Sequence, residues 1–368
     1  MTVIPLVISL IVTGIASAAD VATIGRMGAR TLAVFIALLA ATAGVMMPLC
    51  AAVFAALPPL ASRPPLPPGS ADAAGQLAIA QPQTFAAWVT SLIPSNPVGA
   101  AAAGQMVPLV LFTLLFAVAI ARSPVSTRAT LVSFFQSLGD AMLTLVRWVI
   151  AVAPIGVFAL VLPLAAHAAG SLAGAIGFYI LTYSAASVFA TLLLYLVAPI
   201  GRVRIARFAR AALPAQIIAF SSSSSIAALP ALIEGAERDL GIENRVAGFV
   251  VPLAVSTFKI AAPVSWTIGA LFVARFYGVP LHARDLATIA FAAVFLAFAV
   301  PGIPRGAFIM LAPLFTAIGL PVEGIGMLIA VNAIPDTFAT VLNTTGNLMA
   351  TVLAAERRPQ IWKAESTK

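Results

Sequence analysis

The chain has 368 residues, of which 61% are hydrophobic and 9% are charged. Soluble domains carry charges at about a quarter of their positions, so this composition excludes an ordinary soluble protein. With Cys50 as the only cysteine, disulfide scaffolds, multi-cysteine zinc sites and iron–sulfur clusters are excluded as well. The net charge of +8 comes from short loops between apolar segments, which is typical of membrane topology and not of nucleic-acid binding.

The first two hundred residues predict a series of membrane crossings. After an apolar first segment, Gly25, Arg26 and Arg30 predict a short basic turn, which places this side in the cytoplasm. The Pro-rich stretch from Leu57 predicts an outer loop. Crossings are expected at residues 31–57, 106–121, 141–166 and 172–200. The arginine-rich run at 201–210 then returns the chain to the cytoplasmic side.

Two later apolar stretches are interrupted near their middle by residues that do not suit a lipid-facing helix. Serines at 221–225 interrupt the first, and a Pro- and Gly-rich run at 301–306 interrupts the second. The flanks are too short to cross a hydrocarbon core of about 30 Å, so each stretch predicts a re-entrant hairpin. A full-length apolar helix is expected after each hairpin, at 246–277 and at 322–354. Matching broken segments predict an inverted transporter repeat.

A polar stripe runs along the last expected helix. Its members follow one another in steps of three or four, which places them on one face: Asn332, Asp336, Thr340, Asn343 and Asn347. An ionisable residue at this depth costs at least about 2.5 kcal/mol on insertion, so Asp336 is a candidate functional residue. A stripe that only hydrogen-bonds neighbouring helices stays open as an alternative, above all for Asn332.

Lys259 lies in the middle of the other expected helix, with no charged neighbour between residues 246 and 272. A buried ammonium needs a partner, and Asp336 is the expected one. Two interpretations are open. The pair is either a structural lock between the repeats, or Lys259 is a cationic site for an anion or a titrating group in coupling.

The two interruptions carry further candidates. Ser223, Ser224 and Ser225 supply hydroxyls and backbone N–H groups, and half-helix N-termini directed at this tip favour an anionic group. Arg305 at the other tip either hydrogen-bonds a carboxylate or lies in outside water.

Together these features resemble the dicarboxylate/amino acid:cation symporter family, which includes the glutamate transporters. The resemblance covers nearly the whole chain, and its long motifs include PGIPRGAFIML and GLPVEGIGMLIAVNAIPDTFATVLNTTGN. It implies an all-α polytopic fold in which two re-entrant hairpins and two helices move as an elevator against a scaffold, within a homotrimer. It also implies that the family's first helix is missing, since Met1 aligns inside the second.

The resemblance divides the chain into six parts. They are scaffold helices at 1–57, the outer loop and the start of the next helix at 58–105, the remaining scaffold and transport-domain helices at 106–200, hairpin 1 with its helix at 201–278, hairpin 2 with the last helix at 279–357, and a cytoplasmic tail at 358–368.

For the substrate, the resemblance implies that Asp336 binds an amino group and that Asn343 holds the main carboxylate. The family's side-chain-binding Arg is replaced by Ala339, although Arg305 could supply a guanidinium from the second tip. The expected substrate-binding set is Ser223, Ser224, Ser225, Gly302, Ile303, Arg305, Asp336, Thr340 and Asn343.

For sodium, the resemblance implies a loss of ligands, because hard cations need oxygen ligands. The family's Asn-Met-Asp-Gly-Thr motif aligns with residues 258–262, a Thr-Ser pair with Leu38 and Leu39, and the last sodium carboxylate with Asn347. We therefore expect sodium coupling to be absent or weak, with proton coupling, exchange or uniport in its place. Lys259, Asp336 and Asn347 are the expected coupling residues, with no cofactor and no metal site.

The sequence thus predicts a secondary transporter for a small organic anion, dicarboxylate or amino acid, in the inner-membrane lipid bilayer and without a nucleic-acid partner. The alternative is a ligand sensor that keeps the fold without transport, motivated by the missing ion ligands. A membrane hydrolase is disfavoured, because His167 and His282 lie in outward loops far in sequence from the serines.

Overall fold

The structure is a computed structural model that describes residues 3–16, 21–57, 94–103, 106–142, 144–145, 148, 175–295, 297, 306–309 and 311–355. Within these ranges the chain forms helices joined by turns and contains no strand, which confirms the all-α class. The predicted outer loop, most of the 141–166 crossing and the interruption at 301–305 lie outside the described residues.

In the N-terminal half, the predicted crossings coincide with helices wherever the structure describes them, but one predicted turn is wrong. Its elements are α1 (Val3–Ala16), α2 (Val21–Ala55), α5 (Pro97–Ala102), α6 (Met106–Ala121), a helix at 125–142 and α8 (Ala175–Val197). The prediction of a basic turn at Gly25, Arg26 and Arg30 is wrong, because these residues lie inside α2. Arg30 Nη2 donates to the Leu353 carbonyl at 3.1 Å. This tertiary contact holds the first turns of α2 against α17.

The C-terminal half is built from shorter helices. They are η1 (Ala198–Gly201), α9 (Ile205–Ser222), α10 (Leu229–Glu234), η2 (Gly235–Asp239), α11 (Asn244–Thr257), α12 (Ala262–Tyr277), α13 (Ala283–Phe295), α14 (Gly306–Ile309), α15 (Leu311–Ala317), α16 (Glu323–Val331) and α17 (Ala333–Ala354). The serine run separates α9 from α10, as the sequence predicts. Whether these two helices re-enter the membrane from one side stays a prediction.

Both predicted full-length helices are broken, which corrects the sequence-based expectation. The 246–277 stretch divides into α11 and α12 at residues 258–261, and Pro263 lies in the first turn of α12. Proline is favoured at the start of a helix, where its missing N–H costs nothing. The second stretch bends by 80° between α16 and α17. The 246–277 stretch is therefore interrupted at residues 258–261, and the 322–354 stretch bends before α17.

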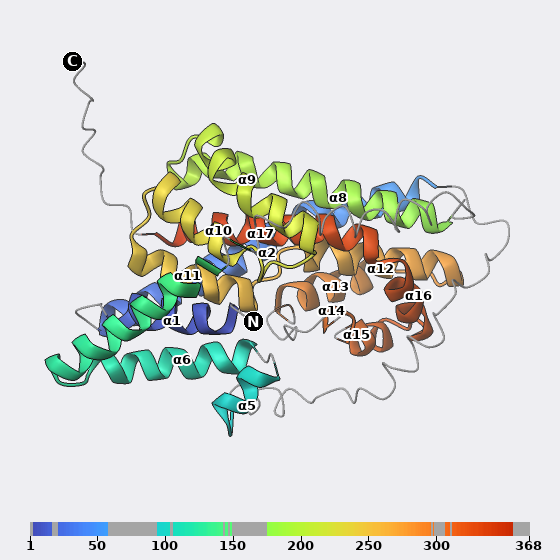
Figure 1. Ribbon diagram of the computed structural model, residues 1–368. Coiled ribbons are helices and arrows are strands. Elements are labelled where there is room, and N and C mark those ends of the chain that lie inside the picture. Colours follow the sequence, from blue (N-terminus) through green and yellow to red (C-terminus); the bar gives the residue numbers. More distant parts are fainter. Residues whose placement is uncertain are drawn as a thin grey trace, which may run out of the picture.

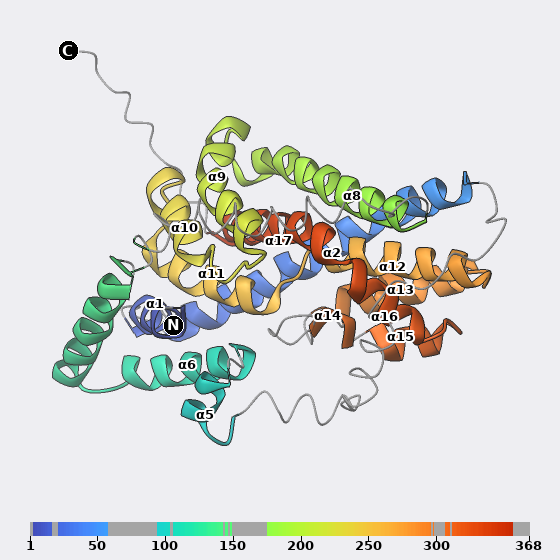
Figure 2. The same cartoon turned by 45° about the vertical axis from the view of Figure 1, so that its right-hand side comes forward.

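The helix α17 lies at the centre of the molecule (Figure 1). It packs against α8, α9, α11 and α2, and the turned view shows the same arrangement, with α17 in red between α8 and α2 (Figure 2). On one side α1 packs against α6 and α11, and on the other α2 packs against α12 and α13. Residues 344–352 of α17 are buried throughout. Along the polar stripe of α17, Thr340 and Asn347 are buried, whereas Asp336 and Asn343 are half-buried.

Three helical segments of the described residues are long and apolar enough to cross a membrane. They are Gly25–Ala55, Gly177–Gly201 and the broken pair Asn244–Tyr277, and the bent pair of α16 and α17 would be a fourth. Along α2, Leu32, Ile36, Val45, Leu49 and Val53 are exposed on one side. Such an apolar surface is costly in water and natural in lipid.

A close approach between α17 and the break at 258–261 gives a first testable prediction. A Cβ atom on Gly346 would lie 2.5 Å from Cγ2 of Ile260, which is fully buried. We expect Gly346→Ala to destabilise the protein by about 1–3 kcal/mol, because an extra methyl in a packed core forces the neighbours apart. Thermal unfolding in detergent measures the loss. The matched control is Gly44→Ala on α2, where a Cβ atom meets nothing within 4 Å. Equal melting temperatures for the two variants would contradict the prediction.

Candidate functional site

The serine run forms a turn that ends one helix and begins another. Ser223 ends α9 with φ of 48°, a left-handed conformation that non-glycine residues rarely adopt. The hydroxyls of Ser221 and Ser222 donate to the Ile218 carbonyl at 3.0 and 2.6 Å. The carbonyl end of α9 and only one helix N-terminus, that of α10, therefore meet at this turn. Of the half-helix N-termini expected at this tip, the described residues show that of α10.

The serine turn packs directly on α17, at residues that neighbour the polar stripe in the sequence. Thr344 Oγ1 donates to Ser225 Oγ at 3.5 Å, and the rings of Phe220 and Phe338 meet edge to face with centroids 5.5 Å apart. Phe338 lies between Asp336 and Thr340 in the sequence. The structure thus brings the serines and the stripe together, although they are more than 100 residues apart. Thr344 was not among the predicted site residues.

Asp336 lies half-buried in the first turn of α17. Its backbone carbonyl accepts a hydrogen bond from Thr340 Oγ1 at 2.7 Å, which holds two stripe residues together. Tyr179 and Tyr183 lie on α8, which packs against α17, and both tyrosines are buried. The sequence offered a signal for them, two tyrosines four residues apart in an apolar helix, which sequence reasoning did not use.

Lys259 lies in the break between α11 and α12, and its predicted partner is wrong. Its Nζ donates to the Val255 carbonyl at 2.6 Å. The three ion pairs found among the described residues include neither Lys259 nor Asp336. The last carbonyls of a helix carry partial negative charge, and α11 ends at Thr257. The ammonium is therefore compensated by the end of its own half-helix.

Asn343 connects the stripe to the same break. Its Oδ1 accepts a hydrogen bond from the Ala261 backbone N–H at 2.9 Å. This N–H lies at the start of α12, where the first N–H groups have no partner within the helix. Lys259 thus hydrogen-bonds a carbonyl near the end of α11, and Asn343 hydrogen-bonds an N–H at the start of α12. With Oδ1 engaged, the Asn343 amide offers its Nδ2 donor to a ligand.

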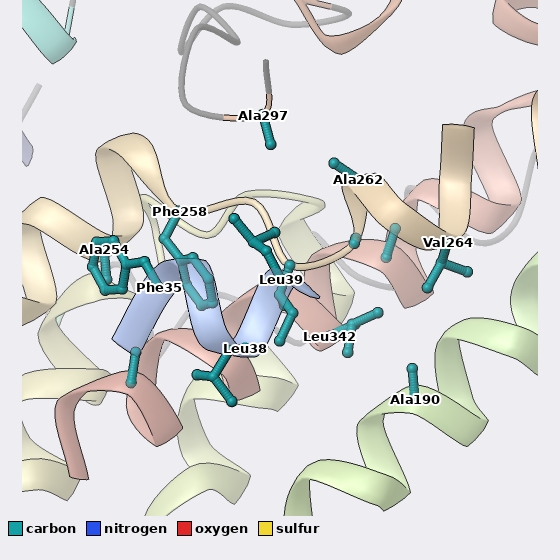
Figure 3. Packing of buried hydrophobic residues seen from close by; sticks show 14 of the residues in the cluster. Phe35, Leu38, Leu39, Ala190, Ala254, Phe258, Ala262, Val264, Ala297 and Leu342 are labelled. Carbon is teal, nitrogen blue, oxygen red and sulfur yellow. The ribbon is translucent and has the colours of Figure 1, made fainter. Parts of the chain in front are cut away.

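Phe35, Leu38, Leu39 and Phe258 lie together in a buried apolar core (Figure 3). Phe35 and Phe258 stack with ring centroids 4.5 Å apart, and both rings are fully buried. Leu38, Leu39 and Ile260 are buried around them. Figure 3 shows Leu38 and Leu39 on the same helix as Phe35, next to this ring pair. These side chains present no oxygen atom.

Asn347 is the polar exception in this core. Its side chain is completely buried, and within the described part of the chain neither its Oδ1 nor its Nδ2 has a hydrogen-bond partner. Buried amides usually form hydrogen bonds, because leaving them unpaired costs about 1–3 kcal/mol per group. The remaining predicted site residues, Gly302, Ile303 and Arg305, lie outside the described residues.

Comparisons with known proteins agree with this architecture. The model of the sodium:dicarboxylate symporter family matches residues 1–357. The chain is 29% identical to the proton/glutamate-aspartate symporter of Escherichia coli (strain K12), over 97% of this chain and 82% of that protein. It is 28% identical to the proton/sodium-glutamate symport protein of Bacillus subtilis (strain 168), with the same coverage. It is also 27% identical to the C4-dicarboxylate transport protein of Azorhizobium caulinodans, over 100% of this chain and 81% of that protein.

The match spans nearly the whole chain and is accompanied by apolar helices long enough to cross a membrane. The family consists of transport proteins and not of enzymes. The chain therefore belongs to the sodium:dicarboxylate symporter family and is a multi-pass inner-membrane secondary transporter of small organic anions.

Proposed function

We propose that the protein carries a dicarboxylate or an amino acid across the inner membrane by an elevator movement, without the family's sodium ligands and with the Lys259 ammonium as a built-in positive charge. The observation that carries this proposal is the hydrogen bond from Lys259 Nζ to the Val255 carbonyl, 2.6 Å long, inside the break between α11 and α12. A cation attached to the chain thus occupies a helix end that carries partial negative charge.

The donors around the serine turn favour an anionic substrate. Ser224 accepts a hydrogen bond from the Ala227 N–H at 3.3 Å, and Ser225 accepts one from Thr344, so both hydroxyl hydrogens are free to donate. We assign the Asn343 Nδ2 donor to the same site, since the Asn343 Oδ1 already accepts the Ala261 N–H. These groups supply neutral donors for one carboxylate. The substrate-binding set of the resemblance, with Gly302, Ile303 and Arg305 from hairpin 2, is carried over as part of this proposal.

The apolar packing around Phe258 supports the loss of sodium coupling. Sodium requires several oxygen ligands, as hard cations generally do. Leu38 and Leu39 on α2 and Phe258 and Ile260 at the break are buried hydrocarbon. Asn347 contributes at most one neutral side-chain oxygen. A sodium site of the family's kind would therefore depend on backbone carbonyls, with the Asn347 oxygen as the one side-chain ligand from these positions.

The names of the relatives leave the alternative coupling modes open. One relative is named as a proton/glutamate-aspartate symporter, and others as proton/sodium-glutamate symport proteins. A proton could therefore replace sodium in this chain. Exchange or uniport is equally compatible with a tethered ammonium, because such a charge needs no ion from solution. Lys259, Asp336 and Asn347 are the proposed coupling residues.

We propose that Arg305 supplies the guanidinium that the family's Arg provides at the position of Ala339. We expect Arg305→Ala to raise the half-saturating concentration of dicarboxylates roughly 10- to 100-fold, the range for a hydrogen bond between charged groups. The matched control is Arg284→Ala, since the Arg284 side chain is 84% exposed. Competition binding on purified protein gives both values. Unchanged affinity for every transported acid would remove Arg305 from the site.

The experiment that tests the proposed function is uptake into proteoliposomes of labelled C4 dicarboxylates and of acidic and neutral amino acids. Each substrate is offered with sodium, with choline, and with an imposed pH gradient. We expect uptake of at least one acid in choline. Binding without flux under every condition would instead favour the ligand sensor. A homotrimer, which the family resemblance implies, is checked by cross-linking of the same preparation.

A further inference from the structure

A chain of hydrogen bonds connects three helices below the serine turn. The Tyr195 hydroxyl of α8 donates to Oε1 of Gln216 on α9 at 3.0 Å, and Gln216 Nε2 donates to Thr345 Oγ1 on α17 at 2.7 Å. Thr345 is completely buried, and its own hydroxyl donates to the Val341 carbonyl at 2.8 Å. The Gln216 amide is therefore held at both its oxygen and its nitrogen, which fixes its orientation.

A weak point of α9 lies two residues before Gln216. Pro214 is inside the helix, and a proline there lacks the N–H that would bond to the carbonyl four residues earlier. Helices bend most readily at such positions. The part of α9 beyond Pro214 ends at Ser222 and leads into the turn that carries Ser223–Ser225. Gln216 is therefore the first polar anchor on the side of the turn.

The part of α9 before Pro214 has other anchors. Arg207 Nε donates to the Asp239 carbonyl at 2.6 Å, and the Phe208 ring packs edge to face on Tyr195 with centroids 5.4 Å apart. Beyond Pro214, the polar contacts with α17 are the 2.7 Å bond from Gln216 to Thr345 and the 3.5 Å bond between Thr344 and Ser225. The Gln216 bond is the shorter of the two.

We propose that Gln216 is a positioning residue. Through Tyr195 and Thr345 it holds the serine turn in register with the polar stripe of α17, so that the serine hydroxyls and the Asn343 amide meet one substrate. Gln216 does not touch the substrate in this account. Its effect on substrate affinity rests on the proposed function, whereas its effect on the position of the turn does not.

The position of the turn is measured directly with two spin labels. Cysteines replace Ser222 at the turn and Ala333 at the start of α17, both exposed, in a Cys50→Ala background that removes the native thiol. We expect Gln216→Leu and Thr345→Val to broaden the distance distribution and shift it to longer distances. Thr345→Ser keeps the hydroxyl and should retain the distribution of the unmodified chain. Identical distributions in all variants would overturn the proposal.

Affinity is measured on the same variants without the labels, using succinate and L-aspartate as probes. We expect Gln216→Leu to raise the half-saturating concentration roughly 3- to 10-fold, the value of one or two neutral hydrogen bonds, with an unchanged number of sites. Thr345→Val should have a similar effect, and the double variant should be little worse than either. Gln136→Leu is the matched control, because Gln136 is exposed on the helix at 125–142.

The outcomes separate the two proposals. If the unmodified chain binds neither probe, the proposed substrate class fails, while the distance distributions still decide the role of Gln216. A lower melting temperature of Gln216→Leu with unchanged affinity and unchanged distances means that Gln216 is only structural, and the positioning proposal is then wrong.

Discussion

Replacing Lys259 with Met is expected to abolish transport. Met keeps most of the length and apolar volume of the lysine side chain but removes its charge. The ammonium would then no longer occupy the end of α11, and a bound anion would lose its tethered counter-charge. Removing one partner of a buried charge pair costs about 3 kcal/mol or more, which is roughly a 100-fold loss of affinity. Equilibrium binding and proteoliposome uptake, measured side by side, check this expectation.

Two further variants make the Lys259 result specific. Lys259→Arg keeps a positive charge and should retain part of the activity. Lys363→Met removes the same charge from the C-terminal tail and should leave transport unchanged. Uptake of Lys259→Met at the rate of the unmodified chain at every pH would refute the tethered-cation account.

Replacing Asp336 with Asn is expected to separate two substrate classes. The carboxylate of Asp336 attracts the ammonium of an amino acid and repels the second carboxylate of a dicarboxylate. Amino acids should therefore lose roughly 100-fold or more in affinity, the value of a buried charge pair of about 3 kcal/mol. Dicarboxylates should bind at least as well as before. The competition assay gives the two affinities in one experiment.

The matched control for this prediction is Asp140→Asn, since Asp140 is exposed on the helix at 125–142. An equal loss for amino acids and dicarboxylates in Asp336→Asn would show that Asp336 acts on the site as a whole and not through an ammonium. No loss for either class would exclude Asp336 from substrate binding.

The polar stripe and the serine interruption could be predicted from the sequence because both depend on local patterns. Residues spaced by three or four share a helix face. Five serines between apolar segments do not continue a lipid-facing helix. The structure places Asp336, Thr340, Asn343 and Asn347 on α17 and Ser223–Ser225 in the turn after α9, as expected. Asn332 lies instead at the bend before α17, and Ser221 and Ser222 belong to the last turn of α9.

The break at residues 258–261 could not be predicted in the same way. Phe258, Ile260 and Ala261 are apolar, and the single charged residue between them, Lys259, does not by itself end a helix. The break is stabilised by Asn343, which lies 82 residues away and accepts the Ala261 N–H. Only Pro263, at the start of α12, was a local signal. The partner of Lys259 was predicted wrongly for the same reason. The Val255 carbonyl is available to Lys259 because α11 ends at Thr257, and the sequence did not predict that helix end.

Whether transport depends on sodium is decided by titrating sodium against uptake. Proteoliposomes with sodium-free buffer on both sides receive a labelled acid that the uptake experiment identifies as a substrate, and the external sodium is then raised at constant ionic strength. We expect an initial rate that does not change with sodium, in the unmodified chain and with or without a pH gradient. A rate that is zero without sodium and saturates with its concentration would show that transport is coupled to sodium, and that backbone carbonyls with Asn347 suffice to bind the ion.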